Sequence, residues 1–354
     1  MVGLLIGALG AILASPIGSL PSDPWSSVPK EIRQSRKAHI EASIAKTDFW
    51  MVPYLKGEQN LEPFTRQGLD PNPAYAAVLA QWAKDKRDIV RAVAFSEELR
   101  LLLAMKDMTV GVKDFASILD RVPALTDPKA QAIAAESVIV TFPFTERGVA
   151  ALGKIYPNNP VDRDRWILAG RNLEAMQEDR KVTPDQARLL GPAPKGWIPE
   201  ALSTSLAGGL KEGDRMQKMD YTTWDGKLLR LDSLHGKPVV LIHTAWWCGA
   251  CRNEIRELGT IMKEGRSRGI EFVIVSGDLD VARTLSWLKA EEAQAPVVWS
   301  PGALGLYSSL LGVRGWPRIT CIDRDFRVSR LDLDPNTRLA SLRGWIDEVA
   351  PLKR

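Results

Sequence analysis

The sequence predicts an α+β chain of two domains, an all-helical domain followed by an α/β domain with a mixed central sheet. Apolar residues recur at helical spacing through the first half, whereas the second half alternates short β-branched runs with amphipathic stretches. A length of 354 residues is enough for about two domains. The segment 191–212 is rich in proline, glycine, serine and alanine, and we expect it to be the linker.

Composition narrows the functional class. The chain is 45% apolar and 25% charged, which is typical of a globular protein. Its net charge of +4 comes without a long basic run, so we expect no nucleic-acid partner, which usually requires a clustered basic face. Only three cysteines are present. They are too few for a disulfide scaffold, and we expect them to be chemical rather than structural.

The first 20 residues carry no charged side chain, and positions 2–14 are apolar or glycine. This pattern is typical of the apolar region of a secretory signal, with small residues near 14–15 for cleavage. The run is too short for a confident membrane span. We therefore expect an extracytoplasmic protein, periplasmic or membrane-associated. A buried N-terminal helix is the alternative.

Residues 28–190 are predicted to form the all-helical domain, of unspecified topology. Tyr75, Val78, Leu79 and Trp82 follow the i, i+3, i+4, i+7 spacing of a helix. The apolar run 130–140 predicts a central helix. Asp127-Pro128 precedes this run, and such a pair is typical of a helix start, with Asp127 as the N-cap and Pro128 in the first turn. Thr183-Pro184 predicts another helix start in the same way.

Little in the helical half indicates chemistry. The adjacent acids Glu97 and Glu98 are interpreted as a solvated helix face, and His39 as an exposed or capping histidine. The functional alternative for this half is a surface that binds a partner protein.

Residues 213–354 are predicted to form the α/β domain. Asp225-Gly226 predicts a hairpin turn between two short strands. A nearly continuous apolar run at 238–244 predicts a buried central strand. The remaining elements are expected to be helices at about 254–263, 281–288, 304–311 and 339–349 and strands at 272–275, 297–298, 319–322 and 326–331.

The stretch that carries chemistry is Cys248-Gly249-Ala250-Cys251, at the predicted junction between the buried strand and a helix. The helix N-terminus favours negative charge, which lowers the pKa of a thiol and makes Cys248 the attacking thiolate. Cys251, almost one turn further on, can then attack a mixed disulfide at Cys248. Half of a zinc site is the alternative. It lacks a second ligand pair, because the remaining His and Cys residues do not occur at ligand spacing.

Residues 218–331 resemble the thioredoxin fold, and more narrowly the exported thiol-disulfide oxidoreductases of the TlpA/ResA-like type. The matching segments are the lead-in to the active-site strand at 231–240, the Trp-Cys-x-x-Cys motif at 247–251, Arg252-Asn253-Glu254, Gly312 to Pro317, and Ile322-Asp323.

This resemblance implies a role for each matched residue. Cys248 and Cys251 would be catalytic, with their disulfide as the only redox group and no further cofactor or metal. Glu254 and Trp247 would assist, Glu254 by moving protons or tuning Cys251. An ordinary surface charge on the helix is the alternative for Glu254. Trp316 and a cis Pro317 would bind an extended substrate. The implied partners are cysteine-containing exported proteins and an electron donor in the membrane or periplasm.

Some positions depart from the family pattern. Trp246 replaces a small residue before the motif, and Phe326 replaces a turn glycine, which puts the geometry of that hairpin in doubt. Cys321 is interpreted as a buried strand cysteine and His243 as a core or strand-end histidine.

Two other functions are weighed against thiol-disulfide exchange. A thiol peroxidase of the related peroxiredoxin group would need a Pro-x-x-x-Thr-x-x-Cys loop, which is missing. A non-catalytic scaffold would bind a partner through the helical half and dock through the other.

Overall fold

The computed structural model describes most of both halves of the chain. The described residues are 24–55, 73–104, 116–139, 146–160, 162–164, 166–167, 211–216, 220–246, 248–278, 281–298, 317–331, 333 and 336–351. The apolar segment 1–20, the second proline start at 183–184, most of the expected linker and the helix expected at 304–311 lie outside this part of the chain.

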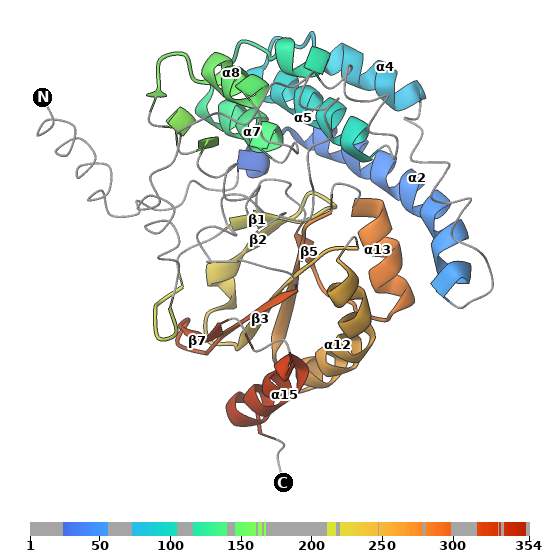
Figure 1. Ribbon diagram of the computed structural model, residues 1–354, viewed down its shortest axis with the longest axis vertical. Helices are drawn as coiled ribbons and strands as arrows, with labels where there is room; N and C mark the ends of the chain where they lie inside the picture. The colour runs from blue at the N-terminus through green and yellow to red at the C-terminus, as the bar shows by residue number, and fades with distance from the viewer. Residues whose placement is uncertain are drawn as a thin grey trace, which may run out of the picture.

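The first half is helical, as predicted (Figure 1). Its elements are η1 (Pro24–Ser27), α2 (Lys30–Leu55), α4 (Pro73–Trp82), α5 (Asp88–Ala104), α7 (Pro128–Ile139) and α8 (Glu146–Ile155). Helix α7 packs against α5, and most of its apolar side chains, among them Ile133 and Val138, are fully buried. The predicted cap is confirmed, since Asp127 Oδ1 accepts the backbone N–H of Lys129 at 2.8 Å.

The prediction for Glu97 was wrong, because this side chain is completely buried. Its carboxylate pairs with Arg36 at 2.9 Å and with Arg100 at 2.6 Å, and it accepts the Tyr75 hydroxyl at 3.0 Å. Burial opposes ionisation, but Arg100 and Arg36 together lower the pKa of Glu97 to about 2. His39 is not simply exposed either, since its ring stacks on Tyr75 at 3.7 Å.

The second half contains a five-stranded mixed sheet, as predicted, and its strands lie in the order β5-β4-β3-β6-β7. Its strands are β3 (Val239–Thr244), β4 (Glu271–Ser276), β5 (Val297–Val298), β6 (Arg318–Ile322) and β7 (Val328–Leu331). Strand β3 lies at the centre, parallel to β4 and antiparallel to β6. All of its residues are buried, which explains the continuous apolar run.

Each face of the sheet has its own core. On one face, Val240 and Ile242 pack with side chains of α12 (Gly249–Ser267), α13 (Val281–Ala290) and α15 (Arg338–Val349). On the other face, Val239 and Leu241 pack with Tyr221 and with the short 3-10 helix η2 (Leu231–Leu234). Because both faces are covered, β3 lies between two cores.

Two hairpin turns contain a residue with a positive φ, a glycine in one and a phenylalanine in the other. The predicted hairpin forms between β1 (Asp220–Thr222) and β2 (Leu228–Arg230), and Gly226 in its turn has a φ of +79°. Between β6 and β7 the turn residue is Phe326, with a φ of +62°. A bulky residue in this left-handed region is uncommon. Burial of the Phe326 ring, which lies beside His235, accounts for a side chain at this position.

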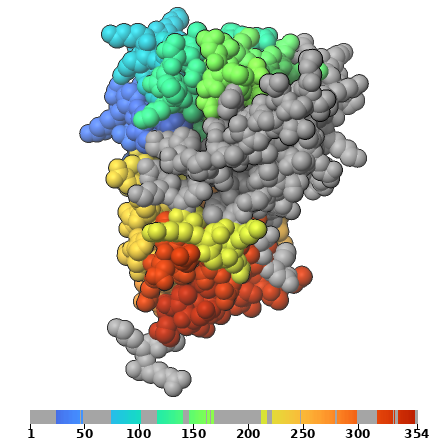
Figure 2. All heavy atoms as spheres, turned by 90° about the vertical axis from the view of Figure 1, so that its left-hand side faces the viewer, coloured from blue at the N-terminus to red at the C-terminus, as the bar shows by residue number. Residues whose placement is uncertain are grey.

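The two halves contact each other along α2 and α13, and Figure 2 shows them stacked along the long axis of the molecule. Ile40 of α2 packs on Val281 of α13. Lys289 of α13 pairs with Asp48 of α2 at 2.6 Å. Arg33 of α2 also donates to the carbonyl of Gly226 in the β1–β2 turn, at 3.0 Å. The helical half therefore rests on the α/β half through both an apolar and a polar contact.

Candidate active site

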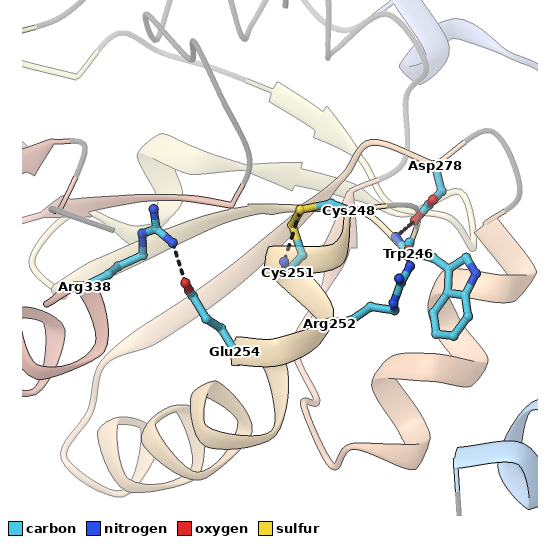
Figure 3. The surroundings of a disulfide bond; sticks show 7 residues. All are labelled: Trp246, Cys248, Cys251, Arg252, Glu254, Asp278 and Arg338. Carbon is cyan, nitrogen blue, oxygen red and sulfur yellow. Dashed lines mark hydrogen bonds and ion pairs between the residues drawn. A yellow bond between two sulfur atoms is a disulfide. The ribbon is translucent and has the colours of Figure 1, made fainter. Parts of the chain in front are cut away.

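The two cysteines of the motif follow the central strand. Strand β3 ends at Thr244, and α12 begins at Gly249 with Cys248 as its N-cap in an extended conformation. The pair therefore lies where the central strand meets the start of a long helix, as predicted (Figure 3). Their Cα atoms are 5.2 Å apart and the two sulfurs form a disulfide.

The surroundings of Cys248 favour a thiolate. Its sulfur accepts the backbone N–H of Cys251 at 3.1 Å. This N–H belongs to the first turn of α12, whose amides have no partner within the helix and carry the positive end of its dipole. The same donor can stabilise a thiolate once the disulfide is reduced. Cys248 is 7% exposed and Cys251 only 2%, so Cys248 is the sulfur more open to a partner.

Trp246, which in the sequence only departs from the family pattern, makes several contacts beside the motif. Its ring meets that of Trp287 in α13 edge-on at 5.8 Å. The guanidinium of Arg252 lies 5.1 Å from the centre of the same ring, and Arg252 Nη1 donates to the Trp246 carbonyl at 2.6 Å. These contacts fix the residue two positions before Cys248.

Sequence reasoning missed Asp278, a buried acid just beyond the end of β4. Its Oδ2 accepts the backbone N–H of Trp246 at 2.7 Å and also the hydroxyl of Thr284. Its own N–H donates to Ser276 Oγ at 3.2 Å. The only signal in the sequence is an acid directly after an apolar strand, at the edge of a sheet where the ends of parallel strands meet.

Glu254 lies one turn beyond Cys251 on α12 and extends towards the last helix. Its Oε1 pairs with Arg338 Nη1 of α15 at 2.7 Å, as Figure 3 shows. The Glu254 side chain is 20% exposed and that of Arg338 only 6%. Glu254 is therefore not the free surface charge that the sequence left as the alternative.

Pro317 is buried and directly precedes β6. Because Arg318 pairs with His243 in the antiparallel register, Pro317 lies at the end of β3 from which the cysteines follow. Trp247 and Trp316, the other two residues that the resemblance implies, lie outside the described part of the chain.

Two further titratable residues, His243 and Cys321, lie inside the strands of the sheet. His243 is fully buried in β3, and burial together with the positive charge of Arg318 lowers its pKa to about 3, so it is neutral at pH 7. Cys321 is buried in β6, and burial raises the pKa of its thiol well above the usual value. Both agree with the core assignments made from sequence.

Clusters of metal-binding side chains and helices that could span a membrane are both absent from the described ranges. Within them, no three His, Cys, Asp or Glu side chains gather in a way that could hold a metal ion. No helix there is both long and apolar enough to cross a bilayer.

Comparison with known proteins agrees with this geometry. A sequence profile described as the AhpC/TSA family matches residues 213–318. The chain is 32% identical over 166 residues to the thiol:disulfide interchange protein DsbE of Escherichia coli, covering 45% of this chain and 80% of that protein. It is 25% identical over 132 residues to the thiol-disulfide oxidoreductase ResA of Bacillus cereus, covering 37% and 73%.

Among solved structures, the chain is similar to a thiol:disulfide interchange protein of the thioredoxin family from Chlorobium tepidum. The match has 24% identity and a TM-score of 0.34, and it covers 40% of this chain and 99% of that one. None of these three matches covers more than half of this chain.

Proposed function

The chain belongs to the family of thiol:disulfide interchange proteins that includes DsbE, and from this premise we propose that it exchanges its Cys248–Cys251 disulfide with cysteines of exported proteins. The observation that carries the proposal is the placement of Cys248 at the N-cap of α12, bonded to the Cys251 N–H. It provides the electrostatic setting that a nucleophilic thiolate needs.

The exchange proceeds in two steps, written here for reduction of a substrate. The Cys248 thiolate attacks one sulfur of a substrate disulfide, and the other substrate sulfur leaves as a thiolate and takes up a proton. The deprotonated Cys251 then attacks Cys248 Sγ, forming the Cys248–Cys251 bond and releasing the first substrate sulfur as a second thiolate. The substrate gains two electrons and the protein loses them. Oxidation of a substrate dithiol is the same sequence reversed.

The neighbouring residues have supporting roles in this proposal. Glu254, on the same helix face as Cys251, exchanges the proton of that thiol. Pro317, with Trp316 and Trp247, forms the surface on which an extended substrate segment lies. The position of Pro317 at the end of β3 supports this assignment, because the cysteines follow the same strand end.

The apolar N-terminal segment supports export, which would place the substrates outside the cytoplasm. A protein that reduces disulfides there needs an electron donor at the membrane or in the periplasm. A protein that installs them needs an electron acceptor instead. The direction depends on how strongly the reduced Cys248 thiolate is stabilised.

The test is the reduction potential of the couple, measured on the full chain by equilibration against glutathione or dithiothreitol. A value near or below about −250 mV would indicate a reductase, and one near about −120 mV an oxidant. Cys248→Ser should abolish the couple, whereas Cys321→Ala should leave it unchanged, because the third thiol is buried in β6. If the wild-type protein shows no reversible two-electron couple, the enzyme proposal fails.

The same preparations distinguish the two other functions. A thiol peroxidase would consume hydrogen peroxide at a rate that depends on Cys248. A scaffold would keep its full cellular function after Cys248→Ser, because partner binding by the helical half does not need the thiol.

A further inference from the structure

We propose that Arg338 is a positioning residue for disulfide exchange, which holds one carboxylate oxygen of Glu254 and leaves the other for the proton of Cys251. The inference rests on the proposed function and adds a residue to it. Arg338 is the first residue of α15, beyond the end of the matched profile at 318. The motif therefore does not identify it, and the matched profile does not reach it.

The contact between the two side chains is shielded and directional. Arg338 Nη1 donates to Glu254 Oε1 at 2.7 Å, and the side chains are 6% and 20% exposed. Solvent and salt screen such a pair much less than a surface pair. A charge-assisted hydrogen bond also has a preferred direction, so it restricts the rotamers available to the carboxylate.

The second oxygen of Glu254 is the observation that points to function. Glu254 Oε2 is buried and has no hydrogen-bond partner among the described residues. A buried acceptor without a partner costs free energy, so its presence calls for an explanation. Cys251 lies three positions earlier on α12, and residues at this spacing are neighbours on a helix surface. A transient hydrogen bond from the Cys251 S–H would give Glu254 Oε2 a partner during the reaction.

Burial of Cys251 explains why such an acceptor is needed. At 2% exposure, the Cys251 thiol has little access to water that could remove its proton. In the proposed step the proton passes from Cys251 Sγ to Glu254 Oε2. The Cys251 thiolate then attacks Cys248 Sγ, the Cys248–substrate bond breaks, and the substrate thiolate leaves. Transfer of the proton from Glu254 to the departing thiolate restores the carboxylate, so protons and electrons balance.

An alternative is that Arg338 only ties α15 to α12. The chain contains a matched pair for this comparison, since Arg343 of α15 bonds Glu257 of α12 at 3.2 Å. That pair joins the same two helices and is exposed, at 40% and 55%. Substitution of Arg343 therefore tests helix attachment without touching Glu254.

The experiment follows the second step directly, in the full reduced chain with Cys321→Ala to leave only the motif thiols. The protein is mixed with 5,5′-dithiobis(2-nitrobenzoate), whose first thiolate is released when Cys248 attacks and whose second is released when Cys251 resolves the mixed disulfide. We expect Arg338→Gln to slow the second release about tenfold, part of the effect of a general base. Arg338→Lys should keep most of the wild-type rate of the second release, because the lysine ammonium can also make the single N–O contact to Glu254. Arg343→Gln should leave it unchanged.

Glu254 provides the decisive comparison. Arg338→Gln should have no further effect in a Glu254→Gln background if Arg338 acts through this carboxylate. An additional loss in that background would overturn the inference, as would a wild-type rate for Arg338→Gln. If Arg338→Gln fails to fold, Glu254→Asp replaces it, since this variant keeps the charge but withdraws the carboxylate. A wild-type rate for Glu254→Asp would equally overturn the inference. Absence of the second release from the wild-type protein would instead contradict the proposed function itself.

Discussion

The ring of Trp246 meets the ring of Trp287 edge-on, with 5.8 Å between their centres, and so joins the segment before Cys248 to helix α13. Another part of α13 faces the helical half, where Val281 packs on Ile40 of α2. A continuous set of packed side chains therefore leads from α2 through α13 to the residue two positions before the attacking cysteine. The helical half therefore packs against α13, and α13 in turn packs against the segment before the cysteine motif.

This arrangement predicts that the apolar contact, not the ion pair, attaches the two halves. Ile40→Ala removes a buried side chain that is 2% exposed, and we expect the free energy of unfolding to fall by about 2–4 kcal/mol. Lys289→Ala removes the pair with Asp48, in which the Lys289 side chain is 65% exposed, and should cost less than about 1 kcal/mol. Urea unfolding of both variants, followed by tryptophan fluorescence, provides the measurement. Equal losses would show that packing between α2 and α13 contributes little.

Asp278 is predicted to stabilise the segment before the motif. Asp278→Ala leaves the Trp246 N–H without its buried acceptor, at a cost of about 1–3 kcal/mol. The Thr284 hydroxyl loses its bond to Asp278 and keeps only its contact with Ser276 Oγ at 3.2 Å. Asp323→Ala is the control, because Asp323 accepts two backbone N–H groups in an exposed turn where water can replace it. Thermal unfolding of the two variants should differ clearly. A similar midpoint for both would contradict the assigned role.

The adjacent acids Glu97 and Glu98 should respond very differently to the same substitution. Glu97→Gln removes the buried carboxylate charge with which Arg36 and Arg100 both pair, which we expect to cost about 3–5 kcal/mol. Glu98→Gln removes a contact of 3.7 Å to the mostly exposed Arg121 and should change stability by less than about 1 kcal/mol. Chemical denaturation distinguishes the two. Equal effects would mean that the network around Glu97 contributes nothing beyond its packing.

Glu97 also shows why part of the structure could not be predicted from sequence. Periodicity identifies a helix, but it does not say which faces are covered when the arrangement of the helices is unknown. The partners Arg36 and Arg100 lie 61 and three positions away. Glu97 becomes interior because α5 packs against α4 and α7, and because Arg36 reaches it from α2. Local signals were sufficient elsewhere. The cap at Asp127, the buried strand β3 and the position of Cys248 at the start of α12 each depend on a few neighbouring residues.

The same distinction holds at the site. The cysteine pair and Glu254 are close in sequence, so their spacing on one helix could be predicted. Asp278 and Arg338 reach the site across 32 and 84 positions respectively, from the end of β4 and the start of α15. Trp246 attracted notice only as an unusual residue. Its role becomes clear from Trp287, which lies on a different helix.

His243 is predicted to make the protein less stable in mild acid. Its pKa is about 3 in the folded protein, because of burial and the nearby charge of Arg318, against about 6.5 for an unfolded chain. Between these two values the unfolded state binds a proton that the folded state does not, so stability falls as the pH decreases through this range. Each unit below 6.5 costs up to about 1.4 kcal/mol, and above 6.5 the residue contributes no pH dependence.

The measurement is the free energy of urea unfolding at pH 7.5, 6 and 5, well above the pKa of about 2 that Glu97 has in the folded protein. His243→Gln carries no titratable group, so its stability should decrease less steeply with acid than that of the wild-type protein. His235→Gln is the matched control, since it removes an exposed imidazole and leaves the buried one in place. Parallel curves for wild type and His243→Gln would show that the buried ring is protonated as readily in the folded protein as in the unfolded chain.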